Sequence, residues 1–403
     1  MKKFITLISI LCLYIMTGCE QSGDVPEVSL SVWGSENEQE LLGQMAEEFA
    51  SEYADEARIS ITVCEESEST CRDTVLFSPE HAADVYAFAD DQLTSLVQAG
   101  ALLSAEDSAD IIYDAGGGED SVAVAAASCD GTLYAYPMTA SNGYFLYYDR
   151  GFFDESDVRS LDRMLDIAAR NDRKVCMDLT SGWYLYSFFR GGGMDVCMDE
   201  SGKNICDFNS VTTPEKGVDV AAAIADIAAH PGFLQGDNDV LVHGVETRQV
   251  IAAVSGTWNE PLFMDYFGDG YDAAMLPEFT VSGDAVQMHS VMGYKLVGVN
   301  AHSKEPLWAK RFALWITNED NQIRRFQARG EGPADVHAAA REEVLSSRAI
   351  AALSAQSRYG HLQRVADSYW DPTYRLGVTL TSGLTDRSSL QKLLDDTVKE
   401  IEN

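Results

Sequence analysis

DGTLYAYPMTASNGYFLYYDR, residues Asp130–Arg150, is the stretch that decides the fold. Its opening Asp-Gly is a turn signal, and the apolar run after it predicts a short strand. We expect that strand to end at Pro137, because proline has no backbone N–H to donate within a central ladder. The bend-prone residues 139–143 follow, and the aromatic run Tyr144–Tyr148 predicts a buried strand of a new sheet. The stretch is therefore interpreted as a crossover between two lobes.

Strands and helices alternate on both sides of this crossover. Strands are predicted at 28–33, 59–63, 84–88, 174–179, 250–254 and 293–300. Apolar residues four apart predict a helix over 39–53, and similar patterns separate the later strands. This alternation predicts an α/β fold with mainly parallel sheets flanked by helices. Open sheets of this kind bind ligands beyond the carboxyl ends of their strands.

The length of the chain, 403 residues, is too great for a single core and suits two lobes. The strand at 293–300 is expected to return to the first sheet, so that both lobes are discontinuous in sequence. We expect residues 28–140 and 293–341 to form the first lobe. Residues 141–292 and 342–403 then form the second, and the strands at the crossings act as hinges.

The charge of the chain limits its partners. The formal net charge is −35, and no basic patch offsets it. Such a surface repels nucleic acid and anionic membranes, so nucleic-acid binding and polyanionic ligands are excluded. A high net charge also keeps a protein soluble, and we draw no catalytic inference from it.

The first residues, MKKFITLISILCLYIMTGC, have the shape of an export signal. Two lysines precede an apolar stretch that is too short to span a bilayer, and small residues precede Cys19. This run resembles a bacterial lipoprotein signal, although Met16 stands where leucine is usual. The resemblance implies removal of residues 1–18, lipidation of Cys19, and a tether over 19–27 at the outer face of the cell membrane, as in Gram-positive surface lipoproteins. Two acyl chains anchor a protein stably. The alternative is an ordinary secretory signal with a free thiol at Cys19.

The cysteines of the exported part leave their redox state open. Cys197 and Cys206 bracket a hairpin-like loop, and Cys64 and Cys71 are close enough in sequence for a second disulfide. Reduced, buried thiols are the equal alternative. No CxxC or CxxH spacing occurs and the seven histidines are scattered, so neither a metal nor a cofactor is expected.

Four of the tryptophans stand beside polar residues rather than inside apolar runs: Trp33, Trp183, Trp258 and Trp370. A sugar ring has an apolar C–H face and a hydroxyl edge, so its site combines aromatic rings with carboxylate and amide groups. Polar groups of that kind lie near the tryptophans or at predicted strand ends: Asp90, Asp91, Gln92, Asn142, Asn259 and Glu260. The alternative for each tryptophan is a partly buried residue that packs within its lobe. The alternative for Asp90 and Asp91 is the start of a helix, where acidic side chains are favoured.

Several segments, in this order, are similar to extracellular solute-binding proteins of sugar importers, above all the maltose- and maltodextrin-binding group. They are LSVWGSENEQ from Leu30, DVYAFADDQLTSLVQAGAL from Asp84, the crossover, AVSGTWNEP from Ala253, and GYKLVGVNAHSKEPLWAKRFALWIT from Gly293. The resemblance implies a periplasmic-binding-protein-like fold of type II and a monomer without catalytic residues. It also implies an oligosaccharide ligand and delivery of that ligand to the membrane subunits of an ABC permease.

The resemblance also implies roles for single residues. Trp258 and Trp370 match stacking positions of the family, and Tyr184 matches a ring that follows the strand at 174–179. Asp91-Gln92 matches an Asp-Arg pair that binds sugar hydroxyls.

Three positions depart from the family pattern. Gln92 replaces the arginine, Asn142 or Ser141 stands where a glutamate is expected, and Gly182-Trp183 replaces Glu-Pro. The rings are retained while the hydroxyl-binding groups differ. This implies a maltodextrin-like carbohydrate ligand, and it does not establish that the ligand is maltose.

Two other functions compete with sugar capture. A glycoside hydrolase needs two carboxylates about 5–9.5 Å apart around one bond, and no pair framed by glycines or aromatics is evident. The same fold could also bind a peptide or another non-sugar solute. The sequence favours binding over catalysis.

Overall fold

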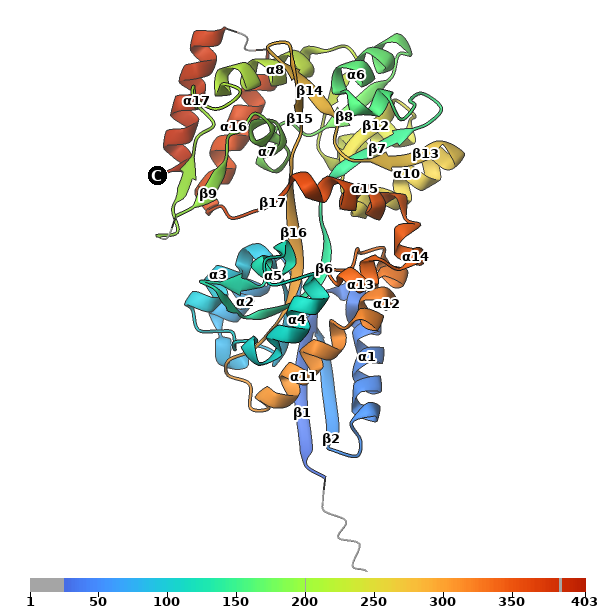
Figure 1. Cartoon of the computed structure of the whole chain (residues 1–403), viewed down its shortest axis with the longest axis vertical. Coiled ribbons are helices and arrows are strands. Elements are labelled where there is room, and N and C mark those ends of the chain that lie inside the picture. The colour runs from blue at the N-terminus through green and yellow to red at the C-terminus, as the bar shows by residue number, and fades with distance from the viewer. Residues whose placement is uncertain (1–24, 200, 384–385) are drawn as a thin grey trace, which may run out of the picture.

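The computed structural model describes residues 25–199, 201–383 and 386–403. The predicted export signal, Cys19 and most of the predicted tether lie outside these ranges. Two lobes, one above the other, are joined by long strands that run between them (Figure 1). No helix within the described ranges combines the length and the apolar character needed to cross a membrane.

The first lobe is built on a six-stranded sheet with the order β17-β16-β3-β1-β2, in which β6 also pairs with β16. The strands are β1 (Glu27–Gly34), β2 (Arg58–Glu65), β3 (Val85–Ala89), β6 (Ala135–Gly143), β16 (Ser290–Val299) and β17 (Gly360–Leu362). β1 is parallel to β2 and β3, whereas β16 is antiparallel to β3. β17 falls in the sequence range predicted for the second lobe, yet it pairs in parallel with β16.

Helices and one short ribbon surround this sheet. They are α1 (Gln39–Glu52), α2 (Cys71–Phe77), α3 (Leu93–Gln98), α4 (Ala109–Gly116), α5 (Val122–Ala126), α11 (Pro306–Ile316), α12 (Glu319–Arg329), α13 (Val336–Ala339) and α14 (Glu342–Leu345), with the ribbon β4 (Ser128–Cys129) and β5 (Thr132–Leu133). α1 buries Phe49, whose ring meets Phe312 of α11 at 5.2 Å between centroids in an edge-on contact. Aromatic pairs of this geometry stabilise a core beyond the area they bury.

The second lobe has a five-stranded sheet with the order β11-β8-β12-β7-β13. Its strands are β7 (Phe145–Asp149), β8 (Lys174–Met177), β11 (Phe233–Gln235), β12 (Val250–Ser255) and β13 (Tyr271–Ala274). Every residue of β12 is buried, as expected for a central strand covered on both faces. β12 is parallel to β8 and antiparallel to β7.

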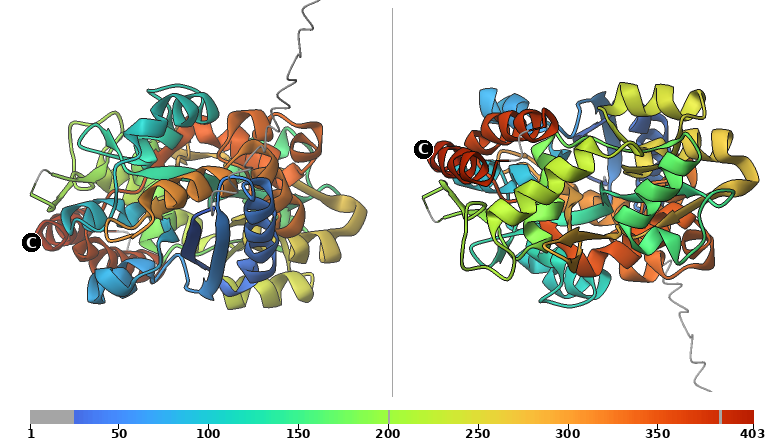
Figure 2. Two further views of the ribbon diagram at one scale, coloured as in Figure 1. Left: turned by 90° about the horizontal axis from the view of Figure 1, so that it is seen from below. Right: turned by 90° about the horizontal axis from the view of Figure 1, so that it is seen from above.

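The remaining elements cover or extend this second sheet. They are α6 (Leu161–Arg170), α7 (Gly182–Gly191), α8 (Gly217–Ala229), α9 (Asn238–Glu246), α10 (Glu260–Phe267), α15 (Arg348–Gln356), α16 (Trp370–Thr381) and α17 (Arg387–Ile401), with the ribbons β9 (Val196–Met198) and β10 (Asn204–Cys206), and β14 (Glu278–Val281) and β15 (Asp284–Gln287). Seen from above, the red helices α16 and α17 lie at one end of the lobe and the yellow helices α9 and α10 at the other (Figure 2).

The crossover is a continuous strand, and the predicted stop at Pro137 is wrong. β6 passes through Pro137 and ends at Gly143. Opposite the proline, the pairing of β6 with β16 shifts register between Lys295 and Leu296. Proline is tolerated at bulges and sheet edges, where a missing N–H leaves no ladder acceptor unpaired. The predicted buried strand after the crossover is confirmed as β7.

The cysteines are free thiols in the described ranges. In the β9–β10 ribbon, Cys197 lies opposite Ile205, whereas Cys206 lies opposite Val196. A register offset of one residue places the two side chains on opposite faces, so Cys197 is exposed and Cys206 is buried. Cys64 and Cys71 differ in the same way, the first exposed and the second buried. The two suggested disulfides are therefore not formed in this structure.

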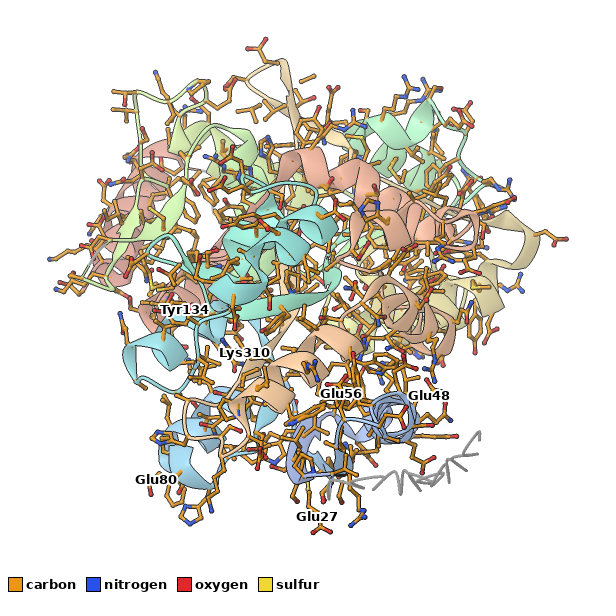
Figure 3. All side chains as sticks on the ribbon, turned by 60° about the horizontal axis from the view of Figure 1, so that its bottom comes forward. Glu27, Glu48, Glu56, Glu80, Tyr134 and Lys310 are labelled. Atoms are coloured by element: carbon orange, nitrogen blue, oxygen red, sulfur yellow. The ribbon has the colours of Figure 1, made fainter. Side chains whose placement is uncertain are left out.

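Several acidic side chains of the first lobe lie on the surface. Glu27, Glu48 and Glu56 of the first lobe are exposed and point outward (Figure 3). Glu27 and Glu56 form exposed ion pairs of 2.7 Å with Arg58 and Arg311. Pairs of this kind contribute little to stability, so the fold does not depend on them.

A buried charge network lies in the first lobe. It contains three carboxylates and three cationic side chains: Glu38, Glu68, Glu331, Lys295, Arg325 and Arg329. The best buried pair is Arg325 with Glu38, whose side chains are 0% and 1% exposed, with 2.7 Å between Nε and Oε1. The network ties α12 to the 3-10 turn Glu36–Glu38, which follows β1, and to the hinge strand β16.

Two histidines stack beside the hinge. The rings of His289 and His361 are 5.1 Å apart and nearly parallel. Nε2 of His361 accepts a hydrogen bond from Arg190 Nε at 3.2 Å and lies 2.8 Å from His289 Nδ1. Arginine can only donate, so this His361 nitrogen is unprotonated and His289 Nδ1 is the second donor. Burial, reinforced by Arg190 and His289, lowers the pKa of His361 from 6.5 to about 4.

We expect His361→Gln to reduce the loss of stability on acidification. In the unfolded chain the His361 pKa is about 6.5. The folded pKa is lower, so the unfolded chain binds the proton first, and the free energy of unfolding falls from about pH 6.5 toward pH 4. We expect this group to account for about 2 kcal/mol after allowance for solvent screening. Urea unfolding at pH 7 and pH 4.5 tests this: an equal loss in both proteins would contradict it.

Candidate functional site

The carboxyl ends of both sheets face the strands that join the lobes. In the first sheet, Ala89 at the end of β3 pairs with Lys295, which of the β16 residues paired with β3 is the one nearest the second lobe. In the second sheet, Ser255 at the end of β12 pairs with Phe145, the first residue of β7 after the crossing. The two strand-end edges therefore meet across the gap between the lobes, where a fold of this kind binds its ligand.

Asp90 follows β3 and is tied into this gap. Its side chain is buried, Oδ1 accepts from the backbone N–H of Tyr294 at 2.8 Å, and Oδ2 accepts from Arg364 Nη1 at 2.8 Å. Burial raises the pKa of Asp90, and the Arg364 guanidinium opposes this rise. Gly293 allows Asn142 to approach, because a Cβ there would lie 2.7 Å from Asn142 Nδ2 and 3.1 Å from Asp90 Oδ1. The structure thus brings Asp90 and Asn142 together.

The neighbours of Asp90 differ in their surroundings. Asp91 is exposed in the short 3-10 turn, Asp90–Gln92, that precedes α3. Gln92 is buried, and its Nε2 donates to the carbonyls of Glu68 and Ser69 at 2.7 and 3.0 Å. Its Oε1 accepts from the backbone N–H of Arg72 at 3.0 Å. The Gln92 side chain therefore holds the loop before α2 in place and has its polar groups occupied within the first lobe.

Trp183 and Tyr184 start α7 and meet the crossover through Tyr144. The Tyr144 ring lies 5.8 Å from Trp183 and 4.9 Å from Tyr184, and its hydroxyl donates to the Trp183 carbonyl at 2.8 Å. The Val291 N–H of β16 donates to the same hydroxyl at 3.3 Å. Burial raises the pKa of Tyr184, so this phenol stays neutral and can donate a hydrogen bond. Tyr144 fixes both predicted rings against the two hinge strands.

Trp370 begins α16 and approaches the same place from the C-terminal part of the chain. Its ring is half-buried and packs edge-on against Tyr369 at 5.1 Å. Trp183, Trp370 and Arg364 line one narrow cavity. The hydroxyl of Tyr369 donates to the Gly182 carbonyl at 2.8 Å and locks α16 to the start of α7. Two of the predicted tryptophans are therefore brought together.

Trp258 lies after β12 and is 50% exposed, which is rare for so large a ring. It lies over Gly256, where a Cβ would meet the indole at 2.0 Å. Asn259 is buried and donates to Asn238 and Ser255 at 2.7 and 2.9 Å. Glu260 accepts from the Tyr271 hydroxyl at 2.8 Å. In this segment the polar side chains are engaged within the second lobe, and the Trp258 ring faces solvent.

Trp33 is the most separate of the predicted rings. It ends β1, is half-buried, and lies 6.3 Å from the Tyr86 ring in the first-lobe core. It faces the same strand-end edge as Asp90, but no described contact joins it to Trp183, Trp258 or Trp370.

Two residues of this site were missed by the sequence reasoning. The sequence predicts Tyr144 only as part of a buried strand, although its ring contacts both Trp183 and Tyr184. Arg364 belongs to no motif, and its only sequence signal is its position six residues before Trp370. Within the described ranges, no three His, Cys, Asp or Glu side chains gather as a metal ion would require.

The comparisons with known proteins agree with this geometry. A family model described as "Bacterial extracellular solute-binding protein" matches residues 44–352, more than half of the chain. A solved structure described as being with acarbose is 28% identical with a TM-score of 0.79, and the match covers 93% of this chain and 98% of that chain. The maltodextrin binding protein MalE1 from L. casei BL23, without ligand, is 22% identical with a TM-score of 0.82, over 93% of this chain and 99% of that one.

A curated relative matches over a shorter stretch. The galactooligosaccharide-binding protein of Bacillus subtilis (strain 168) is 32% identical over 108 residues, which are 27% of this chain and 25% of the relative. The match thus spans a quarter of that relative's length. The family model covers most of both lobes and the whole crossover, and the chain belongs to the bacterial extracellular solute-binding proteins.

Proposed function

We propose that this protein captures an oligosaccharide between its two lobes and delivers it to the membrane subunits of an ABC permease. The observation that carries the proposal is the set of aromatic rings at the carboxyl edge of the second sheet: Trp183, Tyr184, Trp258 and Trp370. They lie opposite Asp90 of the first lobe and Asn142 of the crossing strand β6. Rings facing carboxylate and amide groups suit a ligand that has apolar faces and hydroxyl edges.

The relatives support the choice of a saccharide. One solved structure, 28% identical, is with acarbose, and the curated relative is a galactooligosaccharide-binding protein. We propose a maltodextrin-like ligand, and a peptide or another solute is the alternative within the same fold. We also propose the lobe boundaries given above, with the exception of β17 (Gly360–Leu362), which pairs with β16 of the first sheet. We further propose a monomer and anchoring through a lipidated Cys19.

We propose binding rather than glycoside hydrolysis. Two carboxylates of this region are already engaged, since Asp90 pairs with Arg364 and Glu260 accepts from Tyr271 and Ser347. A hydrolase would need one free acid and one free carboxylate around the bond it cleaves.

We expect the protein from Gln21 onward to be stabilised by one class of oligosaccharide in a thermal-shift screen. A ligand that binds only the native state adds about 2.7 kcal/mol at a hundredfold excess over Kd, which is several degrees in Tm. Maltotetraose, galactooligosaccharides, acarbose and a mixed peptide panel form the test set. Stabilisation by peptides alone would contradict the saccharide proposal. Shorter products after overnight incubation with maltotetraose would replace it with hydrolysis.

A further inference from the structure

Arg364 bridges the two lobes. It lies between β17 and α16, and α16 packs against the second-lobe helices α7, α8 and α17. Two of its acceptors are on Asp90 of the first lobe: Nη1 donates to Asp90 Oδ2 at 2.8 Å and to the Asp90 carbonyl at 3.4 Å. Nη1 also lies 3.2 Å from the carbonyl of the preceding residue, Gln363. Nη2 reaches the carbonyl of Ala126 in α5 at 3.5 Å. The guanidinium is therefore fixed across the gap in which the ligand is proposed to bind.

The same side chain lines the narrow cavity between Trp183 and Trp370 and is 25% exposed. A guanidinium has five N–H donors, and for Nε no acceptor is present among the described residues. The cavity is too narrow to enclose a sugar ring, so a ring stacked on the tryptophans would lie across its mouth. Donors of Arg364 would then meet the hydroxyl edge of that ring.

Asp90 holds the guanidinium rigidly. The carboxylate is buried and is itself fixed by the Tyr294 N–H. A charged pair that is already in place before the ligand arrives loses little conformational entropy on binding. At the position where the resemblance led us to expect an arginine, Gln92 is turned into the first lobe and has no polar atom left for a ligand.

We propose that Arg364 is a ligand-binding residue of the saccharide site. Anchored on Asp90, it donates hydrogen bonds to the hydroxyl groups of a sugar ring that stacks on Trp183 and Trp370. It thereby supplies, from the C-terminal segment, the guanidinium that position 92 lacks. This inference rests on the proposed function.

The experiment measures maltotetraose affinity by isothermal titration calorimetry with the chain from Gln21 onward. We expect Arg364→Lys to bind about tenfold more weakly, because lysine keeps the charge on Asp90 but lacks the forked donors. We expect Arg364→Gln to bind more weakly still, because hydrogen bonds to charged groups are the stronger ones. Arg375→Gln is the matched control, since Arg375 on α16 is exposed and pairs with Glu400. Its affinity is expected to equal that of the wild type.

A double variant separates binding from structure. Arg364→Gln leaves the buried Asp90 without its partner, which alone would destabilise the protein. Asp90→Asn with Arg364→Gln removes both charges, so we expect it to regain thermal stability without regaining affinity. Affinity restored to the wild-type value in the double variant would show a structural role only and overturn the inference. Wild-type binding with undiminished affinity in Arg364→Gln overturns it as well. A wild type that binds no saccharide overturns the proposed function and this inference together.

Discussion

Replacing Trp258 by alanine is expected to weaken oligosaccharide binding at least tenfold and to leave the fold intact. The ring is 50% exposed and lies over Gly256, so its removal opens no cavity in the second-lobe core. Aromatic anchors carry a large part of binding energy, with losses of about 2 kcal/mol or more on truncation to alanine. Surface substitutions away from a core usually change stability by about 0.5 kcal/mol or less. Calorimetric titration with maltotetraose and urea unfolding measure the two effects separately.

Trp308→Ala is the matched control for a tryptophan that serves packing. Trp308 lies on α11, where its ring meets Phe49 edge-on at 6.3 Å and Arg311 stacks over it at 4.7 Å. We expect this variant to lose about 2–4 kcal/mol of stability and to keep the wild-type affinity. An unchanged affinity in Trp258→Ala would remove that residue from the site. A loss of stability equal to that of Trp308→Ala would show that its role is packing.

The fold was predictable because its signals are local. The aromatic run after Gly143 and the apolar run of β12 specify buried strands without reference to the rest of the chain. The sequence does not show that the strand continues through Pro137, because the effect of a proline depends on its position in the sheet. Its pairing partner, Leu296, is far away in the sequence. The state of Cys197 and Cys206 likewise depends on a register of one residue in the β9–β10 ribbon.

The sequence points to the rings of the candidate site more directly than to the contacts of its polar groups. Tryptophans beside polar residues stand out in the sequence, and in the structure Trp183 and Trp370 line one cavity. From the sequence alone, the Gln92 amide could bind either a ligand or a nearby loop. The fold places it beside the Glu68 and Ser69 carbonyls, to which it donates. Arg364 and Asp90 are 274 residues apart, and a pairing across that separation leaves no periodic pattern in the sequence.

Replacing Arg325 by alanine is expected to destabilise the protein by about 3–5 kcal/mol, because the substitution leaves a buried carboxylate without its partner. Arg325 and Glu38 are 0% and 1% exposed, and Arg325 Nη1 also donates to the Ile316 carbonyl at 3.2 Å. Arg329 lies 3.6 Å from the same carboxylate, but Glu331 already holds it at 3.0 Å. The remaining network would therefore compensate Glu38 only in part.

The neighbouring residue supplies the control. Arg324 pairs with Glu48 at 2.6 Å on the surface, where Glu48 points into solvent (Figure 3). Arg324→Ala is expected to cost less than about 1 kcal/mol, because exposed pairs are screened by water. Adding Glu38→Gln to Arg325→Ala removes the stranded charge, so we expect it to recover part of the lost stability. Urea unfolding of the wild type, the two single variants and the double variant measures these differences in stability. If Arg324→Ala and Arg325→Ala lose the same free energy of unfolding, the buried Arg325–Glu38 pair stabilises the protein no more than an exposed pair does.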